Sequence, residues 1–237
     1  MTADPPLLSI VIPVGPGDQA HPGLLRRLAG FPGPCQIVLS TCGPLAARWP
    51  DAAPAGIELI QVEGAAGRAG QLNRGIAAAS GQCLWLMHAD SQPGAAAMAA
   101  AAGFARRCCQ PDRRMTLGWF DLAFAADRPG LVRLNAVGAN LRSRLFRMPF
   151  GDQAWLMHRE MFVRTGGFDE RFGRGEDLDF IVRARRSGGR LCRMQAKITT
   201  SARRYRDHGW LRTTLAHLWL TLRLWLKSIR RSRNRQA

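Results

Sequence analysis

Short apolar runs, each bounded by glycine, proline or polar residues, recur in the first third of the chain. Four of them are residues 7–14 (LLSIVIPV), 36–40 (QIVLS), 57–62 (IELIQV) and 83–87 (CLWLM). Runs this short and this apolar are typical of strands that are covered on both faces. Helical or loop segments separate them, which predicts an α/β fold with a mostly parallel sheet and right-handed crossovers.

The same patterns predict the remaining elements. Further strands are expected at residues 117–124 and 191–198, and a loop followed by a strand at 150–158. Helices are expected at residues 22–28, 71–79, 94–107, 129–147, 159–164 and 176–186. Three of these helices are followed by glycines placed to end them, at Gly81, Gly166 and Gly188.

Two helical segments have an amphipathic pattern. Residues 129–147 carry Leu131, Leu134, Val137, Leu141 and Leu145 at helical spacing, which predicts a helix with its apolar side inward and arginines outward. Residues 210–229 place leucine and tryptophan near one face and precede a basic tail. That segment is expected either to lie in a membrane interface or to pack on the domain. We therefore divide the chain into a main domain, residues 1–205, and a C-terminal amphipathic helix and basic tail, residues 206–237.

The net charge of +17 on 237 residues is unusual and unevenly distributed. Residues 1–100 carry five basic and six acidic side chains, whereas residues 197–237 carry eleven basic and one acidic. Such a gradient indicates an anionic partner, which could be a nucleic acid, an anionic membrane or a phosphorylated substrate. No nucleic-acid-binding motif accompanies the charge, so we expect no specific nucleic acid partner.

The cysteines and the termini suggest a compartment. No CxxC pair or zinc-ligand spacing is present, so most of the six cysteines are expected to be free thiols in a reducing environment: Cys35, Cys42, Cys83, Cys108, Cys109 and Cys192. No basic segment followed by an apolar core begins the chain, and no uncharged apolar stretch is long enough for a membrane span. The expected location is the cytoplasm, where the chain could be peripheral on the inner membrane face.

His88 and Asp90 follow the fourth apolar run. Side chains two residues apart in an extended segment point the same way, so both could reach one ligand beyond the carboxyl end of the strand. A carboxylate and an imidazole suit a divalent cation, and the cation suits a phosphorylated substrate. The alternative is that His88 ends the strand and Asp90 caps the next helix.

Glu176 and Asp177 form a second acidic site, directly after the glycine-rich turn at residues 173–175. Carboxylates at a helix start are stabilised by the helix dipole. One held ionised near a substrate hydroxyl could act as a general base, although acidic residues at a helix start are common for structural reasons alone.

Taken together and in order, these motifs resemble the family 2 glycosyltransferases of the GT-A fold, within a bacterial subgroup that has His-Ala-Asp in place of the usual Asp-x-Asp. That subgroup is often linked to arsenosugar biosynthesis. The resemblance is carried by LSIVIPV at 8–14, GRAGQLNRGIAAASG at 67–81, LMHADSQP at 86–93, FGDQAWLMHREMF at 150–162, GGFDERFGRGEDLDFIVRARRSG at 166–188 and TSARRYRDHGWLRTTL at 200–215.

The resemblance implies a Rossmann-like GT-A domain that moves a sugar from a nucleotide-sugar donor to an acceptor hydroxyl, with inversion. It implies a divalent metal, Mn or Mg, held by Asp90 with His88 in place of an acid. It also implies Asp177 as catalytic base with Glu176 beside it. The acceptor is not identified and could be lipid-linked, and an anionic membrane surface could be a further partner.

It further implies roles for residues that border the donor and the acceptor. Pro13 and Val14 would form the floor of the base pocket or simply end the strand. Arg68 would contact a phosphate, while Gln71 and Asn73 would border the nucleotide, Asn73 by hydrogen bonds to base or ribose. These three could equally belong to an ordinary solvated loop and helix start.

Five further residues follow from the same resemblance. Asp152 and Gln153 would lie on the acceptor side of the cleft. Arg203 and Arg204 would reach a phosphate or form a solvated basic face, while Arg183 would tie its own helix down.

One departure from the family pattern leaves an alternative open. The family has an acidic residue after the second strand, whereas this chain has Ser40, Thr41 and Cys42 there. A second hypothesis is therefore a degenerate, non-catalytic protein of the same fold that binds a nucleotide or a partner.

Overall fold

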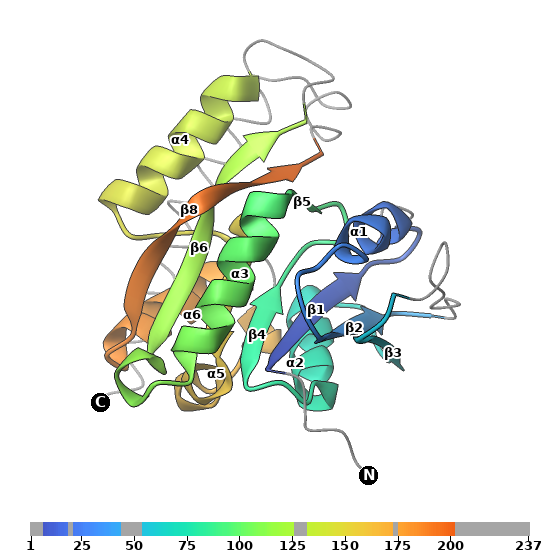
Figure 1. Ribbon diagram of the computed structural model, residues 1–237. Helices are drawn as coiled ribbons and strands as arrows, with labels where there is room; N and C mark the ends of the chain where they lie inside the picture. The colour runs from blue at the N-terminus through green and yellow to red at the C-terminus, as the bar shows by residue number, and fades with distance from the viewer. Residues whose placement is uncertain (1–6, 19–20, 44–53, 126–131, 173–174, 202–237) are drawn as a thin grey trace.

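The structure, a computed structural model, describes residues 7–18, 21–43, 54–125, 132–172 and 175–201. One twisted sheet runs through these residues, and helices cover both of its faces (Figure 1). The strands are β1 Leu8–Val14, β2 Cys35–Thr41, β3 Ile57–Glu63, β4 Cys83–Leu86, β5 Gln92–Pro93, β6 Thr116–Phe124, β7 Trp155–His158 and β8 Arg190–Thr200.

The strand order is β3-β2-β1-β4-β7-β6-β8-β5. Strands β1 to β4 are parallel to one another, and β6 is parallel to β8. Strand β7 is antiparallel to both of its neighbours, β4 and β6, while the short β5 is antiparallel to β8. The predicted mostly parallel α/β sheet is therefore confirmed, and the strand at the centre of the sheet is its main exception.

The helices are α1 His21–Leu28, α2 Arg68–Ala78, α3 Ala95–Cys108, α4 Val132–Leu145, α5 Arg159–Thr165 and α6 Glu176–Arg186.

Two apolar clusters lie on opposite faces of the sheet. Along β1, Ile10 and Ile12 face a cluster with α1 and α3, whereas Val11 faces one with α2, α5 and α6. This alternation explains why β1 is apolar at nearly every position.

Glycines let α2 approach the sheet closely. A Cβ on Gly75 would lie 2.6 Å from Val11 Cγ1, so only glycine fits between the helix and β1. Gly81 does not end α2 as predicted, because the helix stops at Ala78 and its C-cap is Ala79 in an extended conformation. Gly81 instead lies against β1, where a Cβ would come within 2.7 Å of the Ser9 backbone nitrogen.

The C-terminal end of α2 is closed by a side chain from another element. The Arg159 guanidinium donates hydrogen bonds to the carbonyl oxygens of Ile76 at 2.9 Å, Ala79 at 2.5 Å and Gly81 at 3.0 Å. These are carbonyl groups that a helix end leaves without backbone partners. Burial lowers the pKa of Arg159.

Helix α4 packs in the orientation opposite to the prediction. Its inner side is polar, since Asn140 hydrogen-bonds the backbone N–H and carbonyl of Leu122 at 2.7 and 3.0 Å. Ser143 Oγ donates to Gln153 Oε1 at 2.6 Å and is fully buried. The predicted inward apolar stripe is exposed, because these buried hydrogen bonds fix the helix with its leucines outward.

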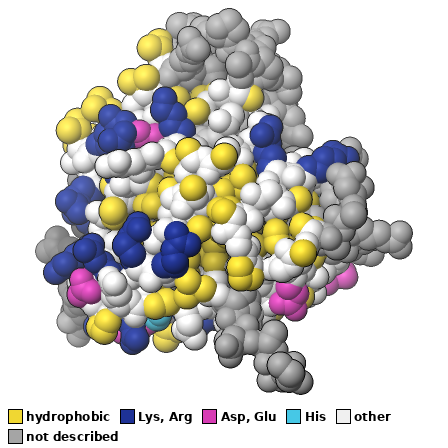
Figure 2. All heavy atoms as spheres, in the orientation of Figure 1, with side chains coloured by type: hydrophobic (Ala, Val, Ile, Leu, Met, Phe, Trp, Pro, Cys, Tyr) yellow, Lys and Arg dark blue, Asp and Glu magenta, His cyan; other side chains and the backbone are white. Residues whose placement is uncertain are grey.

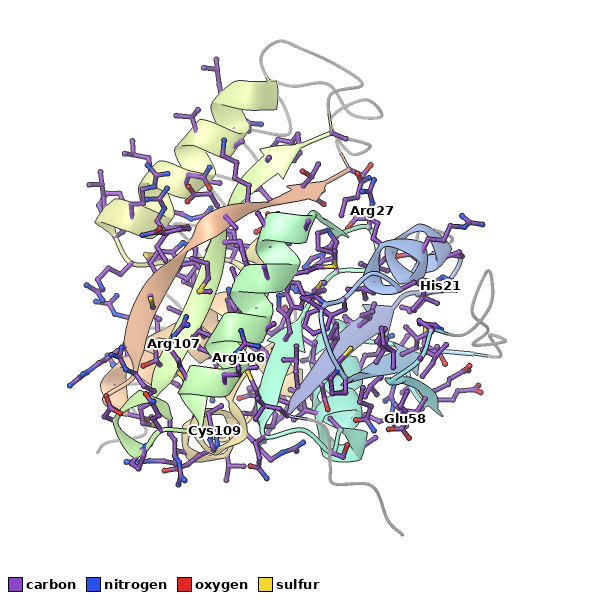
Figure 3. The ribbon with its side chains drawn as sticks, in the orientation of Figure 1. His21, Arg27, Glu58, Arg106, Arg107 and Cys109 are labelled. Atoms are coloured by element: carbon purple, nitrogen blue, oxygen red, sulfur yellow. The ribbon has the colours of Figure 1, made fainter. Side chains whose placement is uncertain are left out.

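The ends of the other helices follow the sequence patterns. Gly166 closes α5 in a left-handed conformation, and Gly188 follows α6 with φ 82°. Arg106 and Arg107 lie in the last turn of α3, where cations favour the helix dipole, and both are labelled in Figure 3.

The described residues bear on the expectations for the cysteines and for membrane spans, but not on those for the C-terminal segment. All six cysteines are free thiols, as predicted for most of them. Within the described ranges no helix is long and apolar enough to cross a membrane. The expected helix at residues 210–229, the basic tail, Leu131, Arg203 and Arg204 lie outside the described residues.

Candidate active site

The His88–Asp90 segment is a turn rather than an extension of β4. Strand β4 ends at Leu86, and the Ser91 N–H donates to the His88 carbonyl at 3.0 Å. The His88 N–H in turn donates to Ser91 Oγ at 3.2 Å. Strand alternation therefore does not determine where His88 and Asp90 point, and that part of the prediction was wrong. The alternative cap was wrong as well, because the N-cap of α3 is Gly94.

Glu176 and Asp177 begin α6, as predicted, after the left-handed Gly175 with φ 94°. Glu176 is buried, and its Oε1 accepts a hydrogen bond from Arg68 Nη1 at 3.0 Å. Burial raises the pKa of the Glu176 carboxyl, the Arg68 charge opposes that shift and the Asp177 charge adds to it. Glu176 thus pairs with the residue that the sequence assigned to a phosphate.

Both oxygens of Asp177 accept backbone hydrogen bonds. Oδ1 accepts from the Leu178 N–H at 2.8 Å, within the first turn of α6. Oδ2 accepts from the Gly151 N–H at 3.0 Å, from a segment 26 residues earlier in the chain. These two bonds hold the carboxylate in one orientation, as a positioned general base requires.

Gly151 is the point where three distant segments meet. A Cβ there would lie 2.3 Å from Arg68 Nη2, so the guanidinium packs directly over the glycine. Through Arg68, Gly151 and Asp177, the start of α2, the short 3₁₀ helix Gly151–Gln153 and the start of α6 come together. No local pattern in the sequence marks Gly151 as a site residue.

Asp152 links this cluster to the turn after β4. Burial raises the pKa of the Asp152 carboxyl; the Arg142 and Arg68 charges oppose the shift, and the Asp177 and Asp90 charges add to it. The charges of both acidic segments therefore bear on Asp152, and its neighbour Gly151 hydrogen-bonds Asp177. Among the described residues, nothing hydrogen-bonds the buried Asp152 Oδ1.

Arg142 is a second residue that sequence reasoning missed. Its guanidinium carbon lies 3.5 Å from the centroid of the Phe150 ring, and its Nε donates to the Met148 carbonyl at 3.1 Å. It therefore fixes the segment that carries Asp152 and acts on the Asp152 charge. Arg142 lies on the inner side of α4. The apolar spacing of that helix predicts its arginines on the outer side, so the sequence pattern does not mark Arg142.

The structure brings Gln71 and the ends of β1 and β2 together. Gln71 Nε2 donates to the carbonyls of Val14 at 2.7 Å and Ser40 at 2.8 Å. Pro13 and Val14 end β1, in register with Ser40 and Thr41 of β2. Gln71 is buried and holds the two strand ends side by side.

Two other predicted contacts are taken up by the chain itself. Asn73 Nδ2 donates to the Phe168 carbonyl at 2.9 Å, and its Oδ1 accepts from the Phe168 N–H at 2.9 Å. Gln153 is fully buried, and its amide bonds Ser143, the Phe150 N–H and the Phe120 carbonyl. Each side chain therefore satisfies polar groups of other elements.

Arg183 has the structural role that the sequence suggested. Its Nε donates to Asp179 Oδ2 at 2.7 Å, and its Nη1 donates to the Thr165 carbonyl at the end of α5. It therefore ties α6 to α5.

The described residues contain no group of three histidine, cysteine or acidic side chains spaced for a metal ion. A magnesium-type site needs only one or two carboxylates, because substrate phosphates and water complete the shell. The Asp152 Oδ1 atom, buried and without a hydrogen-bond donor among described residues, is one oxygen that fits such a shell. Asp90, whose charge also acts on Asp152, is a second candidate ligand, with His88 two residues before it.

Comparison with known proteins finds similarity in structure alone. No model of a protein family matches the chain, and a search of curated proteins finds no match. Solved structures do match. A crystal structure of S. aureus TarS 1-349 has a TM-score of 0.59 at 15% identity, and covers 82% of this chain and 60% of that one.

Two further structures contain nucleotide sugars. The mannosyltransferase PcManGT from Pyrobaculum calidifontis, in complex with GDP-Man and Mn²⁺, has a TM-score of 0.58 at 18% identity; the match covers 83% of this chain and 57% of that one. S. aureus TarS 1-349 in complex with UDP-GlcNAc has a TM-score of 0.58 at 15% identity, over 82% and 58%. The match thus spans under two thirds of each of these proteins, and what it shows is the GT-A type of fold.

Proposed function

We propose that the chain is a family 2 glycosyltransferase that moves a sugar, with inversion, from a nucleotide-sugar donor to an acceptor hydroxyl. The observation that carries the proposal is that Gly151, next to Asp152, donates to Asp177 and lies directly against Arg68. The charges of Asp90 and Asp177 both raise the pKa of the Asp152 carboxyl, which supports a common site for these acids. Neighbours of the same fold that bind GDP-Man or UDP-GlcNAc support the donor class.

Asp177 is the proposed catalytic base. It would take the proton of the acceptor hydroxyl as that oxygen attacks the anomeric carbon, and the bond from that carbon to the diphosphate would break. The two backbone hydrogen bonds hold its carboxylate for this task without consuming all of its lone pairs. Glu176 supports the base indirectly. It anchors Arg68, which packs over Gly151, and the Gly151 N–H donates to Asp177.

Arg68 is the proposed phosphate contact. Its side chain is 30% exposed, whereas the Glu176 side chain with which it pairs is 8% exposed. A guanidinium has five N–H donors, so Arg68 can keep its bond to Glu176 and still donate to a diphosphate oxygen. It would then stabilise charge that develops on the leaving diphosphate.

A divalent cation, Mn or Mg, would be bound by Asp90, His88 and the buried Asp152 Oδ1. When bound, the cation would neutralise and orient the donor diphosphate. Pro13 and Val14, at the strand end fixed by Gln71, would form the floor beneath the base. Asp152 would also border the acceptor.

Replacement of Asp177 by Asn tests the proposal. The assay is release of nucleoside diphosphate from UDP-sugars and GDP-sugars in the presence of Mn²⁺. We expect turnover to fall by about 10²–10⁴-fold while nucleotide binding stays unchanged, because general-base catalysis contributes about that much. Asp112→Asn is the matched control, since that carboxylate lies on the surface with its side chain 69% exposed. Undiminished turnover in Asp177→Asn would reject the assignment.

A second candidate function is a non-catalytic nucleotide-binding or partner-binding protein. Strand β2 ends in Thr41, and neither it nor Ser40 or Cys42 offers a carboxylate to a base or ribose. Calorimetric titration with UDP and with GDP, each with Mn²⁺, separates the two. Nucleotide binding without turnover of any sugar donor favours the second function, whereas turnover establishes the first.

A further inference from the structure

Helix α4 presents an apolar face to solvent. Its exposed large side chains lie at one-face spacing and range from 52% to 65% exposed: Leu134, Val137, Leu141, Leu145 and, just past the helix, Phe146. Only two other large apolar side chains of the described residues are exposed, Leu7 and Val163. In Figure 2 hydrophobic side chains follow the edge of the molecule that α4 occupies in Figure 1.

The inner side of α4 fixes this orientation. Asn140 hydrogen-bonds both backbone groups of Leu122, and Ser143 bonds Gln153, so the polar side of the helix is committed to the sheet. To turn the leucines inward would break these buried bonds and place Asn140 and Ser143 in water. The apolar face is therefore a stable surface feature, and exposed apolar surface of this extent marks an interaction site.

Arginines surround the apolar face. Arg144 and Arg193 both bond the buried Asp121 carboxylate and keep their side chains 45% and 46% exposed. Arg185 Nη1 donates to the Phe146 carbonyl at 3.5 Å, and Arg147 Nη2 to the Leu191 carbonyl at 3.2 Å. Residues 132–145 contain no acidic side chain. Figure 2 shows Lys and Arg side chains gathered beside the hydrophobic edge.

The apolar face of α4 and the arginines around it together indicate what kind of partner binds this surface. A second copy of the chain would bring two arginine-rich rims together, and like charges oppose that contact. Residues 202–237 carry ten Lys and Arg and one Asp, so this segment is also electrostatically mismatched with the rim. A surface of anionic lipids matches both features, because arginines bind the headgroup phosphates while apolar side chains enter the acyl boundary.

We propose that α4 docks flat on an anionic lipid bilayer, with Leu141 and Leu145 inserted and Arg144, Arg185 and Arg193 at the level of the phosphates. The inference stands independently of sugar transfer. Residues 146–150 join α4 to Gly151, and five extended residues span at most about 18 Å. A helix docked in this way therefore keeps the Asp152 segment close to the bilayer.

Flotation of the full chain with vesicles tests this surface. The vesicles are phosphatidylcholine alone and phosphatidylcholine with phosphatidylglycerol. The wild-type protein is compared with the double variant Leu141→Asp and Leu145→Asp and with Val163→Asp, which alters an exposed valine on α5. We expect the wild type and Val163→Asp to float with the anionic vesicles only. We expect the double variant to lose binding by at least about tenfold.

Two further measurements sharpen the result. Added salt should weaken the binding of the wild type, since the attraction between arginines and phosphates is screened. Equal thermal unfolding of all three proteins shows that the double variant is folded. Flotation of the double variant at the wild-type level would overturn the proposal. So would absence of wild-type binding, or a wild-type dimer that the double variant converts to monomer.

Discussion

Arg68 and Glu176 form an ion pair, with 3.0 Å between Nη1 and Oε1, although 108 positions separate them in the chain. The pair joins the first residue of α2 to the first residue of α6. The carboxylate is buried and the guanidinium is partly accessible, so the cation is the member that a ligand can reach. The contact therefore fixes the geometry of the site and leaves a positive charge at its surface.

Replacement of Arg68 by Ala should weaken nucleotide diphosphate binding by about tenfold, since one charge-assisted hydrogen bond to phosphate is lost. Arg68→Lys should restore part of the affinity. Calorimetry with UDP and GDP in the presence of Mn²⁺ measures the effect. Arg171→Ala is the control, because that side chain is 86% exposed on the surface. Unchanged affinity in Arg68→Ala would remove Arg68 from the donor site.

Glu176→Gln should change how stability depends on pH. Burial raises the pKa of the folded carboxyl above the ordinary glutamate value of 4.5, so its protonated form is favoured by folding. The stability that this group contributes is present below pH 4.5 and is lost as the pH rises through the folded pKa. Glutamine does not titrate and so does not lose stability in this way. The stability of the variant relative to the wild type should therefore rise as the pH increases through this window.

Thermal unfolding at a series of pH values measures this difference. Glu160→Gln is the control for the substitution itself, because that carboxylate is 37% exposed. If the difference in thermal stability between Glu176→Gln and the wild type did not vary with pH, the raised pKa of the Glu176 carboxyl would be contradicted.

Gly75→Ala and Gly138→Ala should have opposite effects on stability. A Cβ at Gly75 would meet Val11 Cγ1 at 2.6 Å and Ser40 Cβ at 3.3 Å, so the free energy of unfolding should fall by about 1–3 kcal/mol. Gly138 lies in α4 with nothing within 4 Å of such a Cβ. There alanine should raise the free energy of unfolding by about 0.5–1 kcal/mol through its better helix propensity. Urea denaturation of both variants measures the pair of effects.

Asn140→Ala should loosen α4. It leaves the buried N–H and carbonyl of Leu122 without their partner, which should cost about 2–3 kcal/mol of the free energy of unfolding. The matched control on the opposite side of the helix is Leu134→Asn, which should change stability by less than about 0.5 kcal/mol because Leu134 is exposed. If Leu134→Asn were the costlier change, α4 would pack by its leucines after all.

The elements could be predicted from sequence because they depend on local patterns. The apolar run before Val14 and the glycine after α5 at Gly166 act on neighbours a few residues away. The orientation of α4 could not, because spacing identifies an apolar face without saying what covers it. The partners that decide the question, Leu122 and Gln153, come from other elements.

The site was predictable to a similar degree. Acids at a strand end and at a helix start were found as residue types, and Asp177 lies where the pattern put it. The family resemblance implies that Gln71 and Asn73 border the nucleotide. In the structure each side chain hydrogen-bonds backbone groups of other segments, which no local pattern reveals. Gly151 carried no signal either, since its role depends on the guanidinium packed against it.

The antiparallel placement of β7 between β4 and β6 has a consequence for biosynthesis. Until β7 has been synthesised, β4 has β1 on one side and no strand to pair with on the other. The open edge contains Leu84, Trp85 and Leu86, all buried in the folded protein. Fragments that stop before Trp155 should therefore aggregate along this edge.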